Sequence, residues 1–183
     1  MKNIVIYGGA FNPPTIAHVA ITQAAANFAE TINAEIWIMP SGDRIDKTIS
    51  VNKDKRIAFI EALIGNIKTS TKLSICRYEL FQSQTQTRDT VEYLHRKYPQ
   101  YSFTWLFGSD SVITMPKWAD GDKLIDSLNM LVVQRKGSEI ELTSKMKLLE
   151  VEVPVVSSTE VRNRLIRSEP VDDIVPKNIV ALL

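Results

Sequence analysis

The sequence predicts an α/β fold, a Rossmann-like doubly wound parallel sheet, in a single domain that spans residues 1–183. Short apolar runs alternate with helical segments along the chain, and polar or glycine-rich loops follow several of the apolar runs. Strands that alternate with helices favour a parallel sheet with helices on both faces. Hydrophobic residues make up 44% of the chain, enough to bury one core, and no internal repeat or linker divides it.

Each element follows from a local pattern. Residues 3–7 form an apolar run that Gly8 and Gly9 end, which indicates a short buried strand, and the alanine-rich residues 16–30 indicate a helix. Further strands are predicted at 35–39, 73–76, 103–107, 130–133 and 151–155. Further helices are predicted at 53–64, 89–98, 121–127 and 158–166. Residues 41–52 are polar and lack periodicity, so we expect a mobile loop there.

The charge balance and the cysteine content restrict the class of protein. Lys plus Arg total 22 and Asp plus Glu total 21, so there is no electrostatic case for a nucleic-acid or membrane partner. Cys76 is the only cysteine and lies in an apolar-flanked run, which indicates a buried structural thiol in a reducing compartment. The apolar N-terminal run is too short for a signal peptide or membrane span. We therefore expect a cytoplasmic protein, and leave assembly into a homo-oligomer open.

The loop after the first strand carries the first candidate site. Ligands of open parallel sheets bind beyond the carboxyl ends of the strands, and residues 8–18 (GGAFNPPTIAH) lie there. Thr15 is placed to cap the following helix, which puts His18 in its first turn, where backbone amides and the helix dipole favour an anion. A cap and a satisfied, partly buried histidine would explain the same two residues. The spacing matches neither a dinucleotide fingerprint nor a P-loop.

A second candidate site lies near the other end of the chain. Residues 156–162 (VSSTEVR) follow the last predicted strand, and Ser157 and Glu160 have the spacing of a capping box. A capped surface helix accounts for these two residues. It leaves Arg162 unexplained, whose guanidinium, about one turn from the cap, could reach a phosphate at the start of the helix.

These two loops resemble the signature loops of the nucleotidyltransferase superfamily. Thr15-Ile16-Ala17-His18 is similar to its histidine motif, and residues 157–162 are similar to its serine-threonine-arginine motif. Within the superfamily, the chain resembles the bacterial nicotinate mononucleotide adenylyltransferases over nearly its entire length. Intervening motifs carry this resemblance: 55–57 (KRI), 87–91 (TRDTV), 107–111 (FGSDS), 117–118 (KW), 132–137 (VVQRKG) and 175–176 (VP).

The resemblance implies adenylyl transfer from ATP to nicotinate mononucleotide, which gives nicotinate adenine dinucleotide and pyrophosphate in NAD biosynthesis. The attacking phosphate is already an anion at neutral pH, so the protein must position it and stabilise charge on the other phosphates. A divalent ion, Mg²⁺, would accompany ATP. We expect no metal site in the protein itself, because no carboxylate or histidine cluster with ligand spacing is apparent in the sequence.

The resemblance also assigns roles to individual residues. His18, with Thr15 beside it, is expected at the α- or β-phosphate, Arg162 at the outer phosphates, and Lys47 as a further catalytic cation on the polar loop. The residues expected to bind ATP are Gly8, Gly9, Ala10, Phe11, His18, Gly108, Asp110, Ser158, Thr159 and Arg162. Those expected to bind the mononucleotide are Asn12, Thr87, Trp118 and Arg135.

Simpler explanations exist for two of these residues, Trp118 and Thr87, and the second histidine of the chain is given no role. Trp118 would stack on the pyridine ring, although core packing explains a tryptophan equally well. Thr87 would lie near the nicotinate carboxylate, although a helix cap needs no ligand. His95, beside two basic residues, is expected to be a solvated helix residue rather than a second catalytic histidine.

Three departures from the family pattern keep other functions open. Thr15 stands where most nicotinate-nucleotide enzymes have a histidine, Gln86 replaces a tyrosine, and residues 44–46 (RID) replace a Pro-Pro-His stretch. The alternatives are a pantetheine-phosphate adenylyltransferase, a nicotinamide mononucleotide adenylyltransferase, and a nucleotide sensor whose chemistry has decayed. The block at 108–118 favours a pyridine nucleotide, and the presence of both His18 and Arg162 favours an enzyme.

Overall fold

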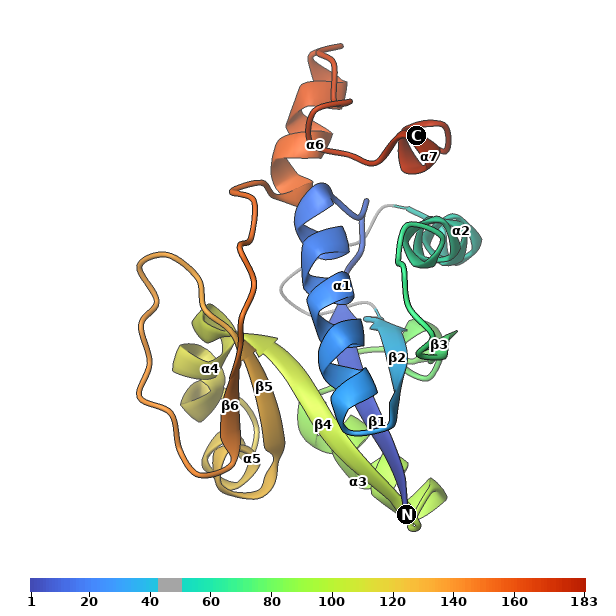
Figure 1. The fold of residues 1–183 in the computed structure, drawn as a ribbon. Helices are drawn as coiled ribbons and strands as arrows, with labels where there is room; N and C mark the ends of the chain where they lie inside the picture. The colour runs from blue at the N-terminus through green and yellow to red at the C-terminus, as the bar shows by residue number, and fades with distance from the viewer. Residues whose placement is uncertain (43–50) are drawn as a thin grey trace.

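A computed structural model describes residues 1–42 and 51–183 (Figure 1). The strands in this part of the chain are β1 (Lys2–Gly9), β2 (Ala34–Pro40), β3 (Leu73–Ile75), β4 (Tyr101–Gly108), β5 (Asn129–Val133) and β6 (Met146–Leu149). They form one sheet in the order β3-β2-β1-β4-β5-β6, and every neighbouring pair is parallel. The predicted α/β fold with a doubly wound parallel sheet is confirmed.

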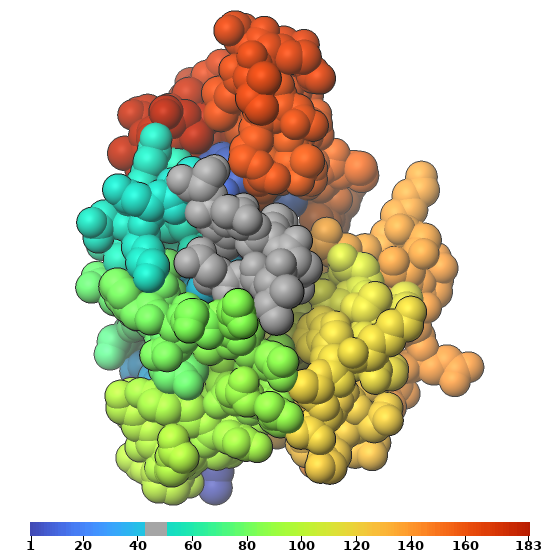
Figure 2. All heavy atoms as spheres, turned by 180° about the vertical axis from the view of Figure 1, so that it is seen from behind, coloured from blue at the N-terminus to red at the C-terminus, as the bar shows by residue number. Residues whose placement is uncertain are grey.

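Helices cover both faces of the sheet. The α-helices are α1 (Ile16–Thr31), α2 (Lys53–Ile64), α3 (Thr87–Lys97), α4 (Ser109–Thr114), α5 (Gly121–Ser127), α6 (Ser158–Ile166) and α7 (Lys177–Val180). Two short 3₁₀ helices are η1 (Glu79–Phe81) and η2 (Met115–Lys117). Buried residues of α1, α2, α6 and α7 join one core cluster, and those of α3, α4 and α5 join another. Figure 2 shows the face that α3, in green, and α4 and α5, in yellow, cover.

The central strand β1 divides the two cores. Val5 and Tyr7 belong to the core beneath α1, whereas Ile4 and Ile6 belong to the core beneath α3. Successive side chains of a strand point to opposite faces, so a strand buried on both faces reads as a continuous apolar run. This is why the sequence pattern identifies β1.

The strand order reverses at β1. The chain runs from β1 outward to β2 and β3, and then returns to β4, which pairs with the other side of β1. Ligands of such sheets bind at the carboxyl ends of the strands where the order reverses. The loops that follow Gly9 of β1 and Gly108 of β4 therefore flank the expected binding region.

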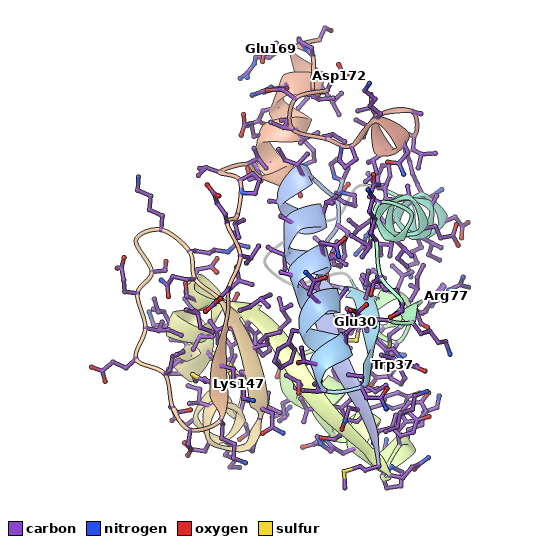
Figure 3. The ribbon with its side chains drawn as sticks, in the orientation of Figure 1. Glu30, Trp37, Arg77, Lys147, Glu169 and Asp172 are labelled. Carbon is purple, nitrogen blue, oxygen red and sulfur yellow. The ribbon has the colours of Figure 1, made fainter. Side chains whose placement is uncertain are left out.

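One expected strand differs from the structure, and some observed helices were not expected. The strand predicted at 151–155 is wrong, since β6 is Met146–Leu149 and the chain beyond it leaves the sheet. Val151 and Val153 are apolar because they pack against the α1 core, not because they pair with a neighbouring strand. Lys147, labelled in Figure 3, is exposed on this edge strand. Its charged side chain interrupts the apolar run by which the strand could be recognised in the sequence. The helices α4 and α7 were not predicted.

Two smaller observations concern the class of protein. Cys76 follows β3 and is only partly buried, whereas a buried thiol was expected. Its backbone N–H donates to the carbonyl of Ile38 at 2.9 Å. Burial raises the pKa of its thiol. None of the helices in the described ranges, 1–42 and 51–183, has the length and apolar character that a membrane crossing requires.

Candidate active site

The loop after β1 has an unusual backbone. Its Asn12–Pro13 peptide bond is cis, and Phe11 has a positive φ of 46°. The buried Phe11 ring packs edge-to-face with Tyr7, with 5.3 Å between the ring centroids, and its centroid lies 5.4 Å from that of the His18 ring. A Cβ on Gly9 would lie 3.2 Å from the Phe11 ring, so this glycine leaves room for the ring. Packing of Phe11 thus fixes the loop in front of His18.

His18 is held by the residue that caps α1. Thr15 is the N-cap, with extended backbone angles, and its N–H donates to His18 Nδ1 at 3.1 Å. The Thr15 hydroxyl oxygen is 2.9 Å from the same nitrogen. The histidine here takes the place of the Glu or Gln in a capping box. Because an amide can only donate, Nδ1 must be unprotonated, and the proton of the neutral ring lies on Nε2.

The surroundings keep His18 neutral. Burial lowers its pKa from 6.5 to about 4, and the positive charge of Arg135 acts in the same direction. Burial also raises the pKa of Tyr7, which therefore remains a phenol. At neutral pH, His18 is thus an uncharged ring whose Nε2–H can donate to an anion.

Helix α6 begins with a side-chain cap. Ser157 is the N-cap, and its hydroxyl accepts a hydrogen bond from the Glu160 N–H at 3.1 Å. The Glu160 carboxylate binds Arg164 at 2.7 Å instead of completing the predicted capping box. The Glu160 side chain thus forms an ion pair one turn along the helix, in place of the capping-box hydrogen bond from the Ser157 N–H.

Helix α6 is also tied to the loop after β1. Arg162 donates from Nη1 to the carbonyl of Asn12 at 2.8 Å and from Nη2 to the Thr159 hydroxyl at 3.0 Å. The Ser158 hydroxyl donates to the carbonyl of Pro13 at 2.8 Å. Segments from opposite ends of the chain thus form one unit, although sequence patterns had suggested only that they share a ligand.

A pocket of about 620 Å³, here called the larger pocket, lies between these two segments. His18 and Arg162 both line it, as do Arg135 and Lys136. Its other lining residues are Tyr7, Ala10, Phe11, Ala17, Ile21, Gln134, Val153, Pro154, Val155, Val156, Ser157, Ser158, Thr159 and Glu160. Three cationic side chains and one neutral imidazole donor make this pocket suitable for a polyanion.

Gly108 and Asp110 lie at the end of β4. Asp110 pairs with Arg135 Nε at 3.2 Å, and the Ser109 hydroxyl accepts from the Arg135 N–H at 2.9 Å. A Cβ on Gly108 would overlap both Asp110 Oδ1 and Arg135 Nε. The absence of a side chain at Gly108 therefore leaves the space that the Asp110–Arg135 ion pair occupies beside the backbone. Arg135, expected with the mononucleotide, lines the larger pocket together with the residues expected to bind ATP.

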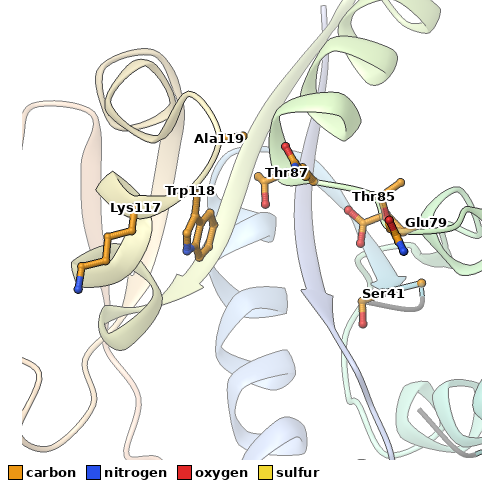
Figure 4. A pocket seen from close by; sticks show the side chains of 10 residues that line it. Ser41, Glu79, Thr85, Thr87, Lys117, Trp118 and Ala119 are labelled. Atoms are coloured by element: carbon orange, nitrogen blue, oxygen red, sulfur yellow. The ribbon is translucent and has the colours of Figure 1, made fainter. Parts of the chain in front are cut away.

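A second pocket of about 320 Å³, here called the smaller pocket, is shown in Figure 4. It is lined by Ser41, Gly42, Glu79, Gln84, Thr85, Gln86, Thr87, Lys117, Trp118 and Ala119. Trp118 is half-buried and packs edge-to-face with Phe107, with 6.1 Å between the ring centroids, so it both joins the core and lines the pocket. The indole lies across the opening from Thr87 and Ser41 (Figure 4). A flat apolar wall faces hydroxyl groups here.

The structure corrects one alternative and locates other candidates. Thr87 is not a helix cap, since α3 begins at Thr87 and Gln86 is the cap residue. His95 is exposed on α3, as expected of a solvated residue. Lys47 lies outside the described residues. Within residues 1–42 and 51–183, no group of three His, Cys, Asp or Glu side chains could hold a metal ion.

Sequence reasoning missed Arg56 on α2. Its side chain is buried and donates to the carbonyls of Ala10 and Ser41. A signal was present, because Arg56 falls at helical spacing with Ile60 and Leu63, on the face of the helix that packs against the core. A charged residue on such a face indicates a specific partner.

Comparisons with known proteins agree with this geometry. Residues 6–164 match the family described as cytidylyltransferase-like. The chain is 30% identical to a probable nicotinate-nucleotide adenylyltransferase of Halalkalibacterium halodurans, over 98% of this chain and 87% of the relative. It is also 30% identical to the nicotinate-nucleotide adenylyltransferase of Bacillus subtilis, over 98% of this chain and 94% of the relative.

The fold is also similar to that of a solved structure. It matches Plasmodium falciparum nicotinic acid mononucleotide adenylyltransferase complexed with NaAD, with a TM-score of 0.85 and 24% identity. The match covers 100% of this chain and 94% of the other. This likeness shows the fold, whereas the family of the chain is shown by the two relatives above. The chain belongs to the cytidylyltransferase-like family and, within it, to the nicotinate-nucleotide adenylyltransferases, which are nucleotidyltransferase enzymes.

Proposed function

We propose that this protein transfers the adenylyl group of ATP to nicotinate mononucleotide, giving nicotinate adenine dinucleotide and pyrophosphate in NAD biosynthesis. One observation carries the proposal: His18 and Arg162, from opposite ends of the chain, line the same pocket at the carboxyl edge of the sheet. The smaller pocket, with Trp118 and Thr87, provides a separate place for the pyridine nucleotide. Membership of the nicotinate-nucleotide adenylyltransferases supports the choice of substrate.

The reaction forms one P–O bond and breaks another. A phosphate oxygen of the mononucleotide attacks the α-phosphorus of ATP, and the bond to the bridging oxygen of the β-phosphate breaks, so that pyrophosphate leaves. The attacking phosphate is already ionised, and no general base is required. The protein instead holds the two substrates in line and stabilises the charge on the transferred and leaving phosphates.

The described side chains suit these tasks. In this proposal, His18 donates its Nε2–H to an oxygen of the α- or β-phosphate, a donor fixed in advance by Thr15. Arg162 and Arg135, which both line the larger pocket, add positive charge. Arg162 uses two donors on Asn12 and Thr159, and a guanidinium has five N–H donors in all, so it can bind the loop and a phosphate together.

Magnesium fits this site as a companion of ATP. Since the described part of the protein offers no cluster of three metal-binding side chains, phosphate oxygens and water would supply most of its ligands. When bound, the ion would neutralise charge on the phosphates. The chain's own cations at Arg135 and Arg162 would then complete the neutralisation.

The smaller pocket favours an acidic pyridine ring. The Trp118 indole offers a face for stacking a flat ring. Helix α3, 11 residues long, begins at this pocket with Thr87, and the start of a helix favours a carboxylate over a neutral amide. Nicotinate is therefore preferred over nicotinamide in this proposal. We also propose the cytoplasm as the site of action, where a lone cysteine stays reduced.

A pyrophosphate-release assay tests the function. The protein is incubated with ATP, Mg²⁺ and one of three acceptors: nicotinate mononucleotide, nicotinamide mononucleotide or phosphopantetheine. We expect the highest kcat/KM with nicotinate mononucleotide. A preference for phosphopantetheine would overturn the choice of substrate, and ATP binding without turnover on any acceptor would indicate a sensor.

A further inference from the structure

Arg56 is a charged side chain inside the core. It is 2% exposed and among the largest fully buried side chains of the described protein. Burying a guanidinium costs free energy unless hydrogen bonds compensate for the lost water. Its position on α2, packed with Ile60 and Leu63 toward the sheet, therefore requires polar partners nearby.

Those partners belong to two different loops. Arg56 Nε donates to the carbonyl of Ala10 at 3.0 Å, and Nη2 donates to the carbonyl of Ser41 at 2.6 Å. Ala10 directly follows β1, and Ser41 directly follows β2. The Ser41 N–H also donates to the carbonyl of Gly9 at 2.9 Å. One planar cation thus fixes the carboxyl ends of two neighbouring strands relative to each other.

Each loop forms the wall of a different pocket. Ala10 lines the larger pocket, and Ser41 lines the smaller one. Gly42, next to Ser41, lies so close to η1 that a Cβ would overlap the carbonyl oxygens of Glu79 and Gln82. The carboxylate of Glu79, another lining residue of the smaller pocket, accepts a hydrogen bond from Thr90 at 2.7 Å. A chain of close contacts therefore runs from Arg56 through Ser41 into the smaller pocket.

We propose that Arg56 is a positioning residue. It holds the larger pocket and the smaller pocket at the relative position that in-line attack requires. This inference rests on the proposed adenylyl transfer, in which each pocket holds one substrate. Arg56 acts through the Ala10 and Ser41 carbonyls and touches neither substrate. Its effect falls on catalysis because a misplacement of about 1 Å between reacting groups can cost about 100-fold in rate.

Arg56→Lys tests the inference. A lysine keeps the positive charge but replaces the planar fork with a single ammonium, which cannot hold both carbonyls in the same geometry. We expect kcat to fall about 100-fold, while KM for ATP and for nicotinate mononucleotide each stay within about threefold. Affinity for each substrate alone, measured by calorimetry, should remain close to that of the wild type, because each pocket is still formed.

Lys55→Met is the matched control on the same helix. Lys55 donates to the carbonyl of Leu183 at 3.0 Å, so this substitution also removes one hydrogen bond from α2, but away from both loops. We expect its kcat to equal that of the wild type. Circular dichroism melting of every variant gives the folded fraction, so that kcat is expressed per folded enzyme.

Several results would overturn the inference. A folded Arg56→Lys protein with wild-type kcat would do so, as would a rise in KM for one substrate with kcat unchanged. If Arg56→Lys does not fold, Arg56→Gln, which can still donate to one carbonyl, is measured in the same way. If neither folds, Arg56 is a purely structural residue. Absence of turnover in the wild type contradicts the proposed function itself, and so is distinguished from failure of this inference.

Discussion

The backbone N–H of Thr15 donates to Nδ1 of His18, and this one hydrogen bond decides which nitrogen of the imidazole faces the larger pocket as a donor. The usual first histidine of the family motif is threonine here, yet the contact that fixes the ring comes from the main chain. The threonine hydroxyl, 2.9 Å from the same nitrogen, adds to it. His18 is therefore orientated without a second imidazole.

Replacing His18 should reduce turnover strongly. We expect His18→Ala to lower kcat by roughly 100-fold, because one preorganised donor to a developing anion is lost. Steady-state pyrophosphate release measures the effect. His95→Ala is the control, since His95 is exposed on α3, and its kcat should be unchanged. Equal activity of the two variants would remove His18 from the mechanism.

The pKa of His18 should also be visible in the pH dependence of stability. Because the folded-state pKa is about 4 and the ordinary value is 6.5, the unfolded chain binds a proton between these pH values that the folded protein does not. His18 therefore lowers the free energy of unfolding by about 2 kcal/mol between pH 7 and pH 5. Urea unfolding at both pH values measures this loss, and His18→Gln should lack it. An identical loss in both proteins would contradict the lowered pKa.

Gly108→Ala should separate the Asp110–Arg135 ion pair, because the added methyl group overlaps both partners. The pair is about half exposed, so its loss should cost at most about 1 kcal/mol of stability. Displacing Arg135 from the larger pocket should raise KM for ATP by about tenfold or more, since a hydrogen bond to a charged group contributes about 1.5–3 kcal/mol. Kinetics and thermal melting are compared with those of Gly65→Ala, at the end of α2. A large loss of stability with normal KM would contradict this account of Gly108.

Trp118→Ala should show which substrate binds in the smaller pocket. Losing the stacking surface should raise KM for nicotinate mononucleotide by about tenfold, since ring stacking contributes about 1–3 kcal/mol. KM for ATP should stay unchanged, because Trp118 lines only the smaller of the two pockets described. The opposite pattern, a change confined to ATP, would show that the substrates have been placed in the wrong pockets.

The strands that the sequence predicts most clearly are those with long apolar runs, although β3, whose residues are only partly buried, is predicted as well. β1, β2, β4 and β5 each carry a run of apolar residues, and the sequence indicates all four. The edge strand β6 could not be found, because only Met146 and Leu149 are buried and Lys147 interrupts the run. An apolar pattern reports burial, and it does not report which backbone the strand pairs with.

The candidate site was predictable where short motifs carry the chemistry. His18, Arg162 and the loops around them lie together in the larger pocket. The contacts that hold these loops were not predictable, because they join side chains to backbone carbonyls far along the chain, as Arg162 does with Asn12. Such partners have no sequence signature at the acceptor, since every residue has a carbonyl.

The hydrogen bonds between α6 and the loop after β1 have a consequence for the biosynthesis of the protein. Translation reaches Ser158 and Arg162 only after all six described strands have been made, and these residues hold the carbonyls of Pro13 and Asn12. All six described strands can therefore be synthesised before the residues that fix the loop after β1. In the proposed function, a chain that ends before Arg162 lacks this guanidinium and cannot form the complete larger pocket.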